Sequence, residues 1–396
     1  MSKQNSPLVL GTERISKLLT QYAIPAIIAM TASSLYNMAD SIFIGHGVGP
    51  LAISGLALTF PLMNLAAAFG SLVGVGASTL VSVKLGQKDY EGANKVLGNV
   101  LVLNVVLGLA FTLVFMLLLD PILYFFGASE NTILYARDYM NVILIGNVIT
   151  HMYLGLNAVL RSSGFPKLAM YATLASVVIN CVLNPLFIFG FGWGIKGSAW
   201  ATVISQVISL TGQLIHFSRP KELLHFKKGI YRLKSEIVKG ILYIGMSPFL
   251  MNLCACLIVI LINRGLKEHG GDMAIGAYGI VNRVVFLFIM IIMGFNQGMQ
   301  PIAGYNFGAR QYSRVTEVTK LTMKWAIGVA TTGFLLCQLF PSVIVRMFTT
   351  DPELIEAAVY GLHIVFAVFP IVGFQMVRHG EFSFLLKFKY LQFFAA

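Results

Sequence analysis

Charged side chains are scarce in this chain. Asp, Glu, Lys and Arg together make up 11% of its 396 residues, while hydrophobic residues make up 57%. Soluble domains carry about 25% charged residues, so a water-soluble core could not hide this much apolar surface, and the surplus is expected to face lipid. The apolar runs are about 20 residues long and do not alternate with polar residues, which favours helices over barrel strands. The sequence therefore predicts an all-α, polytopic transmembrane helical bundle.

Cysteine is also rare, and the motifs of several enzyme classes are missing. The four cysteines lie within apolar runs, at spacings that fit neither a disulfide framework nor a zinc site. The chain has no G-x-x-x-x-G-K-[ST] phosphate loop, no H-E-x-x-H and no paired Asp-rich motif that would hold magnesium and a prenyl diphosphate. These absences argue against an ATP-hydrolysing or intramembrane enzyme, and no cofactor is expected other than a coupling ion.

The apolar runs predict ten membrane spans. They cover residues 18–44, 51–83, 95–119, 134–159, 168–190, 197–217, 238–262, 274–302, 321–345 and 358–377. No cleavable signal peptide is expected, because Met1–Gly11 is short and polar. Of the 28 Lys and Arg residues, 22 fall on one side of the membrane and five on the other. The positive-inside rule therefore predicts a plasma-membrane protein with both termini in the cytoplasm.

The net charge of +12 follows from this topology. Its basic residues are scattered over separate loops, so a nucleic-acid partner is not expected. The basic stretch 219–239 is interpreted as an amphipathic connector lying on anionic lipid, with a specific binding site as the alternative.

The two halves of the chain resemble each other at matched positions about 222 residues apart. Gly86–Tyr90 (GQKDY) matches Gly308–Tyr312 (GARQY), in loops that each follow a long span. Six spans separate the halves, so they have the same orientation and form a parallel repeat, an arrangement in which transporters often bind substrate near the bilayer midplane. The predicted organisation is a six-helix lobe over 1–218, a basic cytoplasmic linker over 219–237, a four-helix lobe over 238–377 and an aberrant tail over 378–396.

The second half is shorter than the first by two spans, so the chain is expected to hold about ten of twelve. The tail that begins at Arg378 does not match its first-half counterpart, which runs on into a fifth span. We interpret the tail as the result of a frameshift or truncation. If the DNA downstream encodes no further hydrophobic spans in any frame, this interpretation is wrong.

Asp40 is the candidate for ion coupling. The chain has sixteen acidic residues, and only Asp40 sits well within an apolar stretch, in Tyr36–Gly45 (YNMADSIFIG). A carboxylate inside a span costs about 2.5–3.5 kcal/mol on insertion scales, and such residues usually face the bundle interior and mark ion paths. Removal from water favours the neutral acid, so Asp40 is expected to bind and release a proton. The alternatives are a sodium site and an idle carboxylate at the outer interface.

A sodium ion would need further oxygen ligands near Asp40. Asn180 and Asn184 lie four residues apart, so they share one helix face, and Thr202 offers a hydroxyl from the next span. Buried Asn side chains also bond across helices for packing alone, and both interpretations stay open. Pro185 follows Asn184 and would free a helical carbonyl that could line the same cavity; a simple packing kink is the alternative.

Several segments resemble the multidrug and toxic compound extrusion (MATE) family, particularly its bacterial MepA-like and DinF-like branch. They are Tyr36–Gly45, Ala274–Gly279, Gln300–Ala309, Asn180–Ile188 (NCVLNPLFI) and Gly197–Gln206 (GSAWATVISQ). The resemblance implies two six-helix lobes around a central cavity and export of cationic drugs in exchange for H⁺ or Na⁺.

The resemblance also implies a cation site in the N-terminal lobe. The first-span Asp falls on Asp40, its partners fall on Asn180, Asn184 and Thr202, and Tyr36 lies near by helical spacing. A bound Na⁺ would use Asp40, Asn180 and Thr202. Many members carry a second acidic residue at the position of Asn184. Because Asn184 is neutral, less negative charge is available to bind sodium here. The seventh-span Glu of some members has no counterpart in 246–263.

The expected function is that of a secondary active multidrug exporter, an antiporter of cationic or amphipathic organic compounds against H⁺ or Na⁺. Its partners are expected to be small organic cations or drugs and membrane lipids, with the chain acting as a monomer. One alternative is a lipid-linked oligosaccharide flippase. Such a flippase would line its cavity with several basic residues for the diphosphate, and only Arg283 lies within a span. A membrane enzyme is the less favoured alternative.

Overall fold

The computed structural model describes residues 7–348 and 351–378, and these ranges contain helices but no strands. The aberrant tail predicted from Arg378 onward lies outside them, apart from Arg378 itself. The helical elements are η2 (Pro7–Gly11), α1 (Ile15–Gly47), α2 (Pro50–Gly86), α3 (Tyr90–Leu117), α4 (Leu119–Phe125), α5 (Glu130–Ile145), α6 (Asn147–Ser162), α7 (Pro166–Pro185), η3 (Leu186–Gly190), α8 (Gly194–Phe217), α9 (Ser235–Gly308), α10 (Tyr312–Leu339), α11 (Pro341–Arg346) and α12 (Pro352–Ala367). The predicted all-α membrane bundle is confirmed.

Six helical stretches in the described ranges are long and apolar enough to cross a membrane, and two bent helix pairs raise that number to eight. Eight of the ten predicted spans coincide with these stretches. The other two, 197–217 and 321–345, fall on α8 and α10 (with α11). These helices are long enough to cross but more polar, because α8 carries Ser, Thr and Gln along its length and α10 carries Lys324 and several Thr residues.

Helix α9 differs from the expected pair of separate spans. Helical conformation continues from Ser235 to Gly308, over 74 residues, through the connection predicted between 262 and 274. It nevertheless holds two apolar stretches, Ser235–Ile258 and Ala277–Gly308, at the positions of the two predicted spans.

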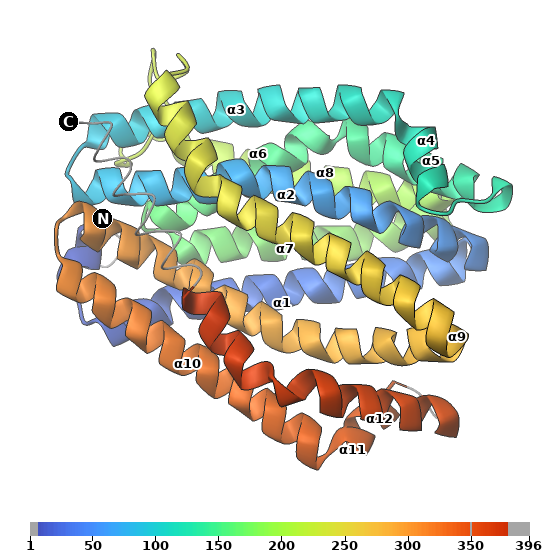
Figure 1. Cartoon of the computed structure of the whole chain (residues 1–396). Coiled ribbons are helices and arrows are strands. Elements are labelled where there is room, and N and C mark those ends of the chain that lie inside the picture. The colour runs from blue at the N-terminus through green and yellow to red at the C-terminus, as the bar shows by residue number, and fades with distance from the viewer. Residues whose placement is uncertain (1–6, 349–350, 379–396) are drawn as a thin grey trace. The chain divides into compact units, whose positions relative to one another are not determined.

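The chain forms two compact units. Of the described residues, the first unit contains 7–12, 32–253 and 304–310, and the second contains 13–31, 254–303, 311–348 and 351–378. In the first unit α2, α3, α5, α6, α7 and α8 pack side by side (Figure 1). Their inward side chains form an apolar core with Leu62, Tyr139 and Met140 among its buried members. In the second unit α10, α11 and α12 pack together. The predicted lobe boundaries at 218 and 238 stay a prediction.

The backbone supports the internal repeat. Among the residues that the structure describes, Lys88 (φ 61°) and Arg310 (φ 59°) are the only non-glycine residues with left-handed φ. They occupy matched positions of the two GxxxY loops, 222 residues apart. L-residues rarely adopt this conformation, so the two loops share an uncommon backbone turn as well as a sequence pattern.

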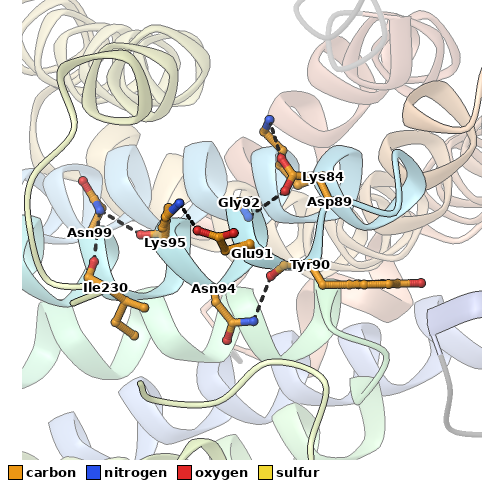
Figure 2. Close-up of polar contacts among 9 residues, drawn as sticks. All are labelled: Lys84, Asp89, Tyr90, Glu91, Gly92, Asn94, Lys95, Asn99 and Ile230. Carbon is orange, nitrogen blue, oxygen red and sulfur yellow. Dashed lines mark hydrogen bonds and ion pairs between the residues drawn. The ribbon is translucent and has the colours of Figure 1, made fainter. Parts of the chain in front are cut away.

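The first of these loops is fixed by polar contacts (Figure 2). Asp89 accepts a hydrogen bond from the Gly92 amide at 2.8 Å, which caps α3, and pairs with Lys84 at 2.9 Å. Partial burial acts to raise the pKa of the Asp89 carboxyl, but the bonds from Lys84 and Gly92 outweigh it and hold that pKa below its usual value. The carboxylate therefore keeps its charge at neutral pH, and its contribution to stability is lost only as the pH falls into the acid range.

The basic linker is held against α3 by two buried asparagines, Asn94 and Asn99. Asn94 Nδ2 donates to the Leu223 carbonyl at 3.3 Å, and its Oδ1 accepts from the His225 amide at 3.0 Å. Asn99 bonds the backbone of three linker residues, the carbonyls of Ile230 and Arg232 and the amide of Lys234. Residues 219–234 form turns and bends without a helix, so this connector is an irregular strap.

Replacement of Asn99 by alanine is expected to loosen this strap. The buried Ile230 carbonyl would lose its side-chain partner, and an unsatisfied buried group costs about 1–3 kcal/mol. The partly buried backbone groups of Arg232 and Lys234 would lose theirs at a smaller cost. The thermal midpoint of purified Asn99→Ala should therefore fall clearly below that of the unmodified chain. Asn131→Ala, at an exposed position on α5, is the matched control and should not shift the midpoint. Equal midpoints for both variants would contradict the structural role of Asn99.

Helices α2 and α9 approach each other through glycine. A Cβ added to Gly245 of α9 would lie 1.7 Å from the Leu72 carbonyl oxygen of α2, and a Cβ added to Gly76 of α2 would lie 2.0 Å from the Ile241 carbonyl oxygen of α9. Small residues at such a crossing let two backbones touch. Gly70 and Gly74, two other glycines of α2, are less tightly packed, because their added Cβ atoms would meet their neighbours no closer than 3.1 Å and 3.4 Å.

Candidate functional site: a buried carboxylate between α1, α5, α7 and α8

Asp40 lies near the end of α1 with 5% of its surface exposed. Its Oδ1 accepts hydrogen bonds from Ser198 Oγ of α8, at 2.5 Å, and from Asn184 Nδ2 of α7. Its Oδ2 receives the longer contact of the Tyr139 hydroxyl of α5, at 3.5 Å. Helices α1, α5, α7 and α8 thus each supply one side chain, and every donor to the carboxylate is neutral.

A second layer of polar groups extends this cluster. Asn184 Nδ2 also reaches Asn180 Oδ1 at 3.4 Å, and Asn180 Nδ2 donates to Thr202 Oγ1 at 3.2 Å. The Thr202 hydroxyl and the Tyr36 hydroxyl share a hydrogen bond of 2.8 Å. The result is a continuous polar chain that leads from Asp40 through two amides and a hydroxyl back to α1.

Helical spacing explains why these residues converge. Tyr36 and Asp40 on α1, Asn180 and Asn184 on α7, and Ser198 and Thr202 on α8 are pairs separated by four residues, so each pair lies on one face of its helix. Helix α7 ends at Pro185, whose ring cannot donate a backbone hydrogen bond, and the chain continues as the π-helical turn η3. Such turns are frequent at functional sites, and this one begins two residues after Asn184.

The structure brings all five sequence-predicted residues into one cluster, and their role in cation coupling stays a prediction. Tyr36 lies one helical turn before Asp40 and bonds Thr202, whereas Tyr139 contacts the carboxylate. Sequence reasoning missed Ser198 and Tyr139. The spacing of four residues between Ser198 and Thr202 was a usable signal, but nothing local to Tyr139 marks it, since its approach depends on how α5 packs.

The cluster is suited to hold a small cation. A buried carboxylate that lacks a positive partner carries a large desolvation cost, and no basic side chain pairs with Asp40 in residues 7–348 and 351–378. The buried Asn184 Oδ1 has no hydrogen-bond partner, so a free oxygen faces the same region. Hard cations prefer oxygen ligands of this kind. No group of three His, Cys, Asp or Glu residues that could bind a transition metal occurs in the described part of the chain.

An ionisable side chain buried inside a multi-pass helical bundle is typical of membrane transporters, and this is the class that the fold and the site define. Comparison with known proteins gives the family. The sequence model of the MatE family matches residues 25–186 and 244–383. The chain therefore belongs to the MatE family, which confirms the resemblance found in its motifs.

Individual relatives agree with this assignment. The multidrug export protein MepA of Staphylococcus aureus (strain N315) is 30% identical over 370 residues, which cover 92% of this chain and 81% of that protein. An outward-facing multidrug resistance MATE transporter of the MOP superfamily is 24% identical and shares the fold, with a TM-score of 0.88 over 98% of this chain and 87% of that one. The crystal structure of MATE in the bent conformation is 25% identical, with a TM-score of 0.87 over 97% and 87% of the two chains.

Proposed function

We propose that this chain is a secondary active exporter that exchanges cationic or amphipathic organic compounds for H⁺ or Na⁺ across the plasma membrane. The observation that carries the proposal is the Asp40 cluster, a buried carboxylate whose partners are all neutral oxygen and amide groups. Membership of the MatE family supports the transport class. The MepA relative, a multidrug export protein by name, supports organic compounds as the cargo.

In the proposed cycle the cation from outside binds at Asp40 and neutralises its charge. Neutralisation removes the cost of the buried carboxylate and changes which hydrogen bonds from Ser198, Asn184 and Tyr139 are favourable. The altered packing of α1 against α5, α7 and α8 promotes release of the organic compound to the outside. Binding of the next compound from the cytoplasm favours the cation-free state, so the two ligands exclude each other.

The choice between H⁺ and Na⁺ depends on the number of oxygen atoms around the ion. A proton needs only Asp40, whereas Na⁺ would add Asn180 and Thr202 and could also use the unpaired oxygen of Asn184. Asn184 is neutral, so the site offers a single negative charge. We further propose that the chain works as a monomer in contact with lipid, with both termini in the cytoplasm and without enzymatic activity.

Transport in vesicles tests the proposal. The purified full chain is reconstituted in liposomes, and export of the cationic dye ethidium is measured while the H⁺ and Na⁺ gradients are varied separately. Dye movement is expected to follow one of the two gradients and to stop when that gradient is collapsed. Dye movement that ignores both gradients, or no dye movement under any gradient, would refute the proposed exchange.

A further inference from the structure

A stripe of buried polar side chains runs along the whole length of α8. It consists of Ser198, Thr202, Ser205, Ser209, Gln213 and His216, which we call the α8 polar stripe. Successive members are three or four residues apart, so they lie on one face of the helix, and each is at most 6% exposed. Its first two members belong to the Asp40 cluster. The remaining four lead away from the cluster to the end of α8, where the basic linker begins.

The neighbouring helices add polar groups to the same seam near its middle. Ser205 Oγ donates to the Thr202 carbonyl at 2.8 Å, and Ser176 Oγ of α7 donates to Ser205 Oγ at 3.3 Å. Tyr153 of α6 is also buried, and Asn157, one turn further along α6, donates to Thr173 Oγ1 of α7 at 3.3 Å. Polar contacts therefore continue from the Asp40 cluster into the interior between α6, α7 and α8.

Beyond Ser205 the stripe contains buried polar atoms without partners. Ser209 Oγ and both side-chain amide atoms of Gln213 lie away from solvent and make no hydrogen bond to protein. A buried group left in this state costs about 1–3 kcal/mol, and proteins usually satisfy such groups with ordered water. Ser209 and Gln213 are four residues apart, so water bound between them would extend the polar contacts toward the cytoplasmic end of α8.

A second branch of the seam ends at a positive charge. Asn157 of α6 donates to Thr173 Oγ1 at 3.3 Å, and Asn157 Oδ1 accepts a bond from the Arg161 guanidinium. A guanidinium repels an approaching cation, so this branch is a poor exit for one. The α8 branch carries only neutral hydroxyl and amide groups between Thr202 and Gln213, which suit the passage of a hydrated cation.

We propose that the α8 polar stripe, hydrated beyond Thr202, is the path along which the cation bound at Asp40 leaves toward the cytoplasm. This inference rests on the proposed cation exchange and adds to it a route and its residues. Ser205, Ser209 and Gln213 act by holding water along the route. They do not touch the bound cation at Asp40, so their loss affects release and leaves binding intact.

Gln213→Leu in the full chain tests the path. Leucine has a similar volume and removes two unsatisfied polar atoms, so the thermal midpoint is expected to stay level or to rise. Ethidium-coupled cation flux into liposomes is expected to fall at least tenfold, measured for H⁺ with an internal pH dye and for Na⁺ with ²²Na. Equilibrium binding of ethidium, and its change with H⁺ or Na⁺ concentration, should stay within twofold of the unmodified chain.

Thr211→Val is the matched control, because Thr211 lies on the exposed side of α8 and bonds only its own helix; its flux should be normal. Ser209→Ala is the second test variant and should reduce flux in the same way. If Asp40→Asn stops export while Gln213→Leu and Ser209→Ala transport normally, the path is wrong and the exchange at Asp40 stands. If Gln213→Leu alters cation-dependent binding, the path is also wrong. Normal export by Asp40→Asn would refute the proposed cation exchange at Asp40.

Discussion

Asp40→Asn is expected to abolish gradient-driven export, with at least a hundredfold loss of ethidium transport in liposomes. Asparagine has nearly the same size as aspartate but carries no charge and cannot be protonated, so neither H⁺ nor Na⁺ has an anion to bind. The amide also brings an NH₂ group toward Ser198 and Asn184, which both donate to the carboxylate. A hundredfold loss of transport rate corresponds to an activation barrier higher by about 2.7 kcal/mol.

The control for this variant is Asp138→Asn on α5. Asp138 pairs with Lys196 at 3.1 Å, and both side chains are well exposed. Exposed ion pairs contribute about 0–1 kcal/mol, so its transport should remain within about twofold of normal. The thermal midpoint of Asp40→Asn must be measured alongside transport, because an unfolded variant would be inactive for a trivial reason. A folded Asp40→Asn protein that exports dye under a gradient would exclude Asp40 as the coupling group.

Gly245→Ala is expected to have the largest effect on stability. The new methyl group would lie 1.7 Å from the Leu72 carbonyl oxygen, and the obstacle is backbone, which cannot turn away as a flexible side chain can. Overpacking of a tight contact costs about 1–3 kcal/mol and sometimes more, and we expect about 3 kcal/mol or more here. The measurement is the thermal midpoint of the purified protein, followed by size-exclusion chromatography after heating.

Gly212→Ala is the matched control on α8. An added Cβ there meets nothing within 4 Å, and glycine inside a helix is destabilising by about 0.5–1 kcal/mol relative to alanine. The same chemical change should therefore raise or preserve the midpoint at 212 and lower it sharply at 245. Two equal shifts would show that the α2–α9 contact is not as close as described.

Much of the fold could be predicted from composition and periodicity, because lipid-facing helices must be long and apolar. The helix α8 shows the limit of this reasoning. Its polar residues are buried between neighbouring helices, so the low hydropathy of α8 does not mean that the helix is exposed to water. The linker shows another limit. Its positive charge was visible, but its shape depends on Asn94 and Asn99, which come from a helix more than a hundred residues earlier in the chain.

The candidate site was predictable in part for a similar reason. Asp40, Asn180, Asn184 and Thr202 stand out because polar residues are rare in apolar runs and because helical spacing places the two asparagines on one face. Tyr139 could not be singled out, since tyrosine is common near membrane interfaces and its contact with Asp40 depends on tertiary packing. The internal repeat also extends to backbone conformation, because Lys88 and Arg310, at matched positions of the two halves, both have left-handed φ.

The contact between α2 and α9 also sets a single register. One turn away on the same helix face, Gly76 has Leu72 and Leu80 and Gly245 has Ile241 and Phe249. A slide of one turn along either helix would therefore bring a large side chain against a carbonyl oxygen. At this contact both helices present backbone atoms. The two helices can therefore separate and come together again without a change of side-chain rotamer at Gly76 or Gly245. If the two helices part during a transport cycle, they can rejoin quickly, and only in the original alignment.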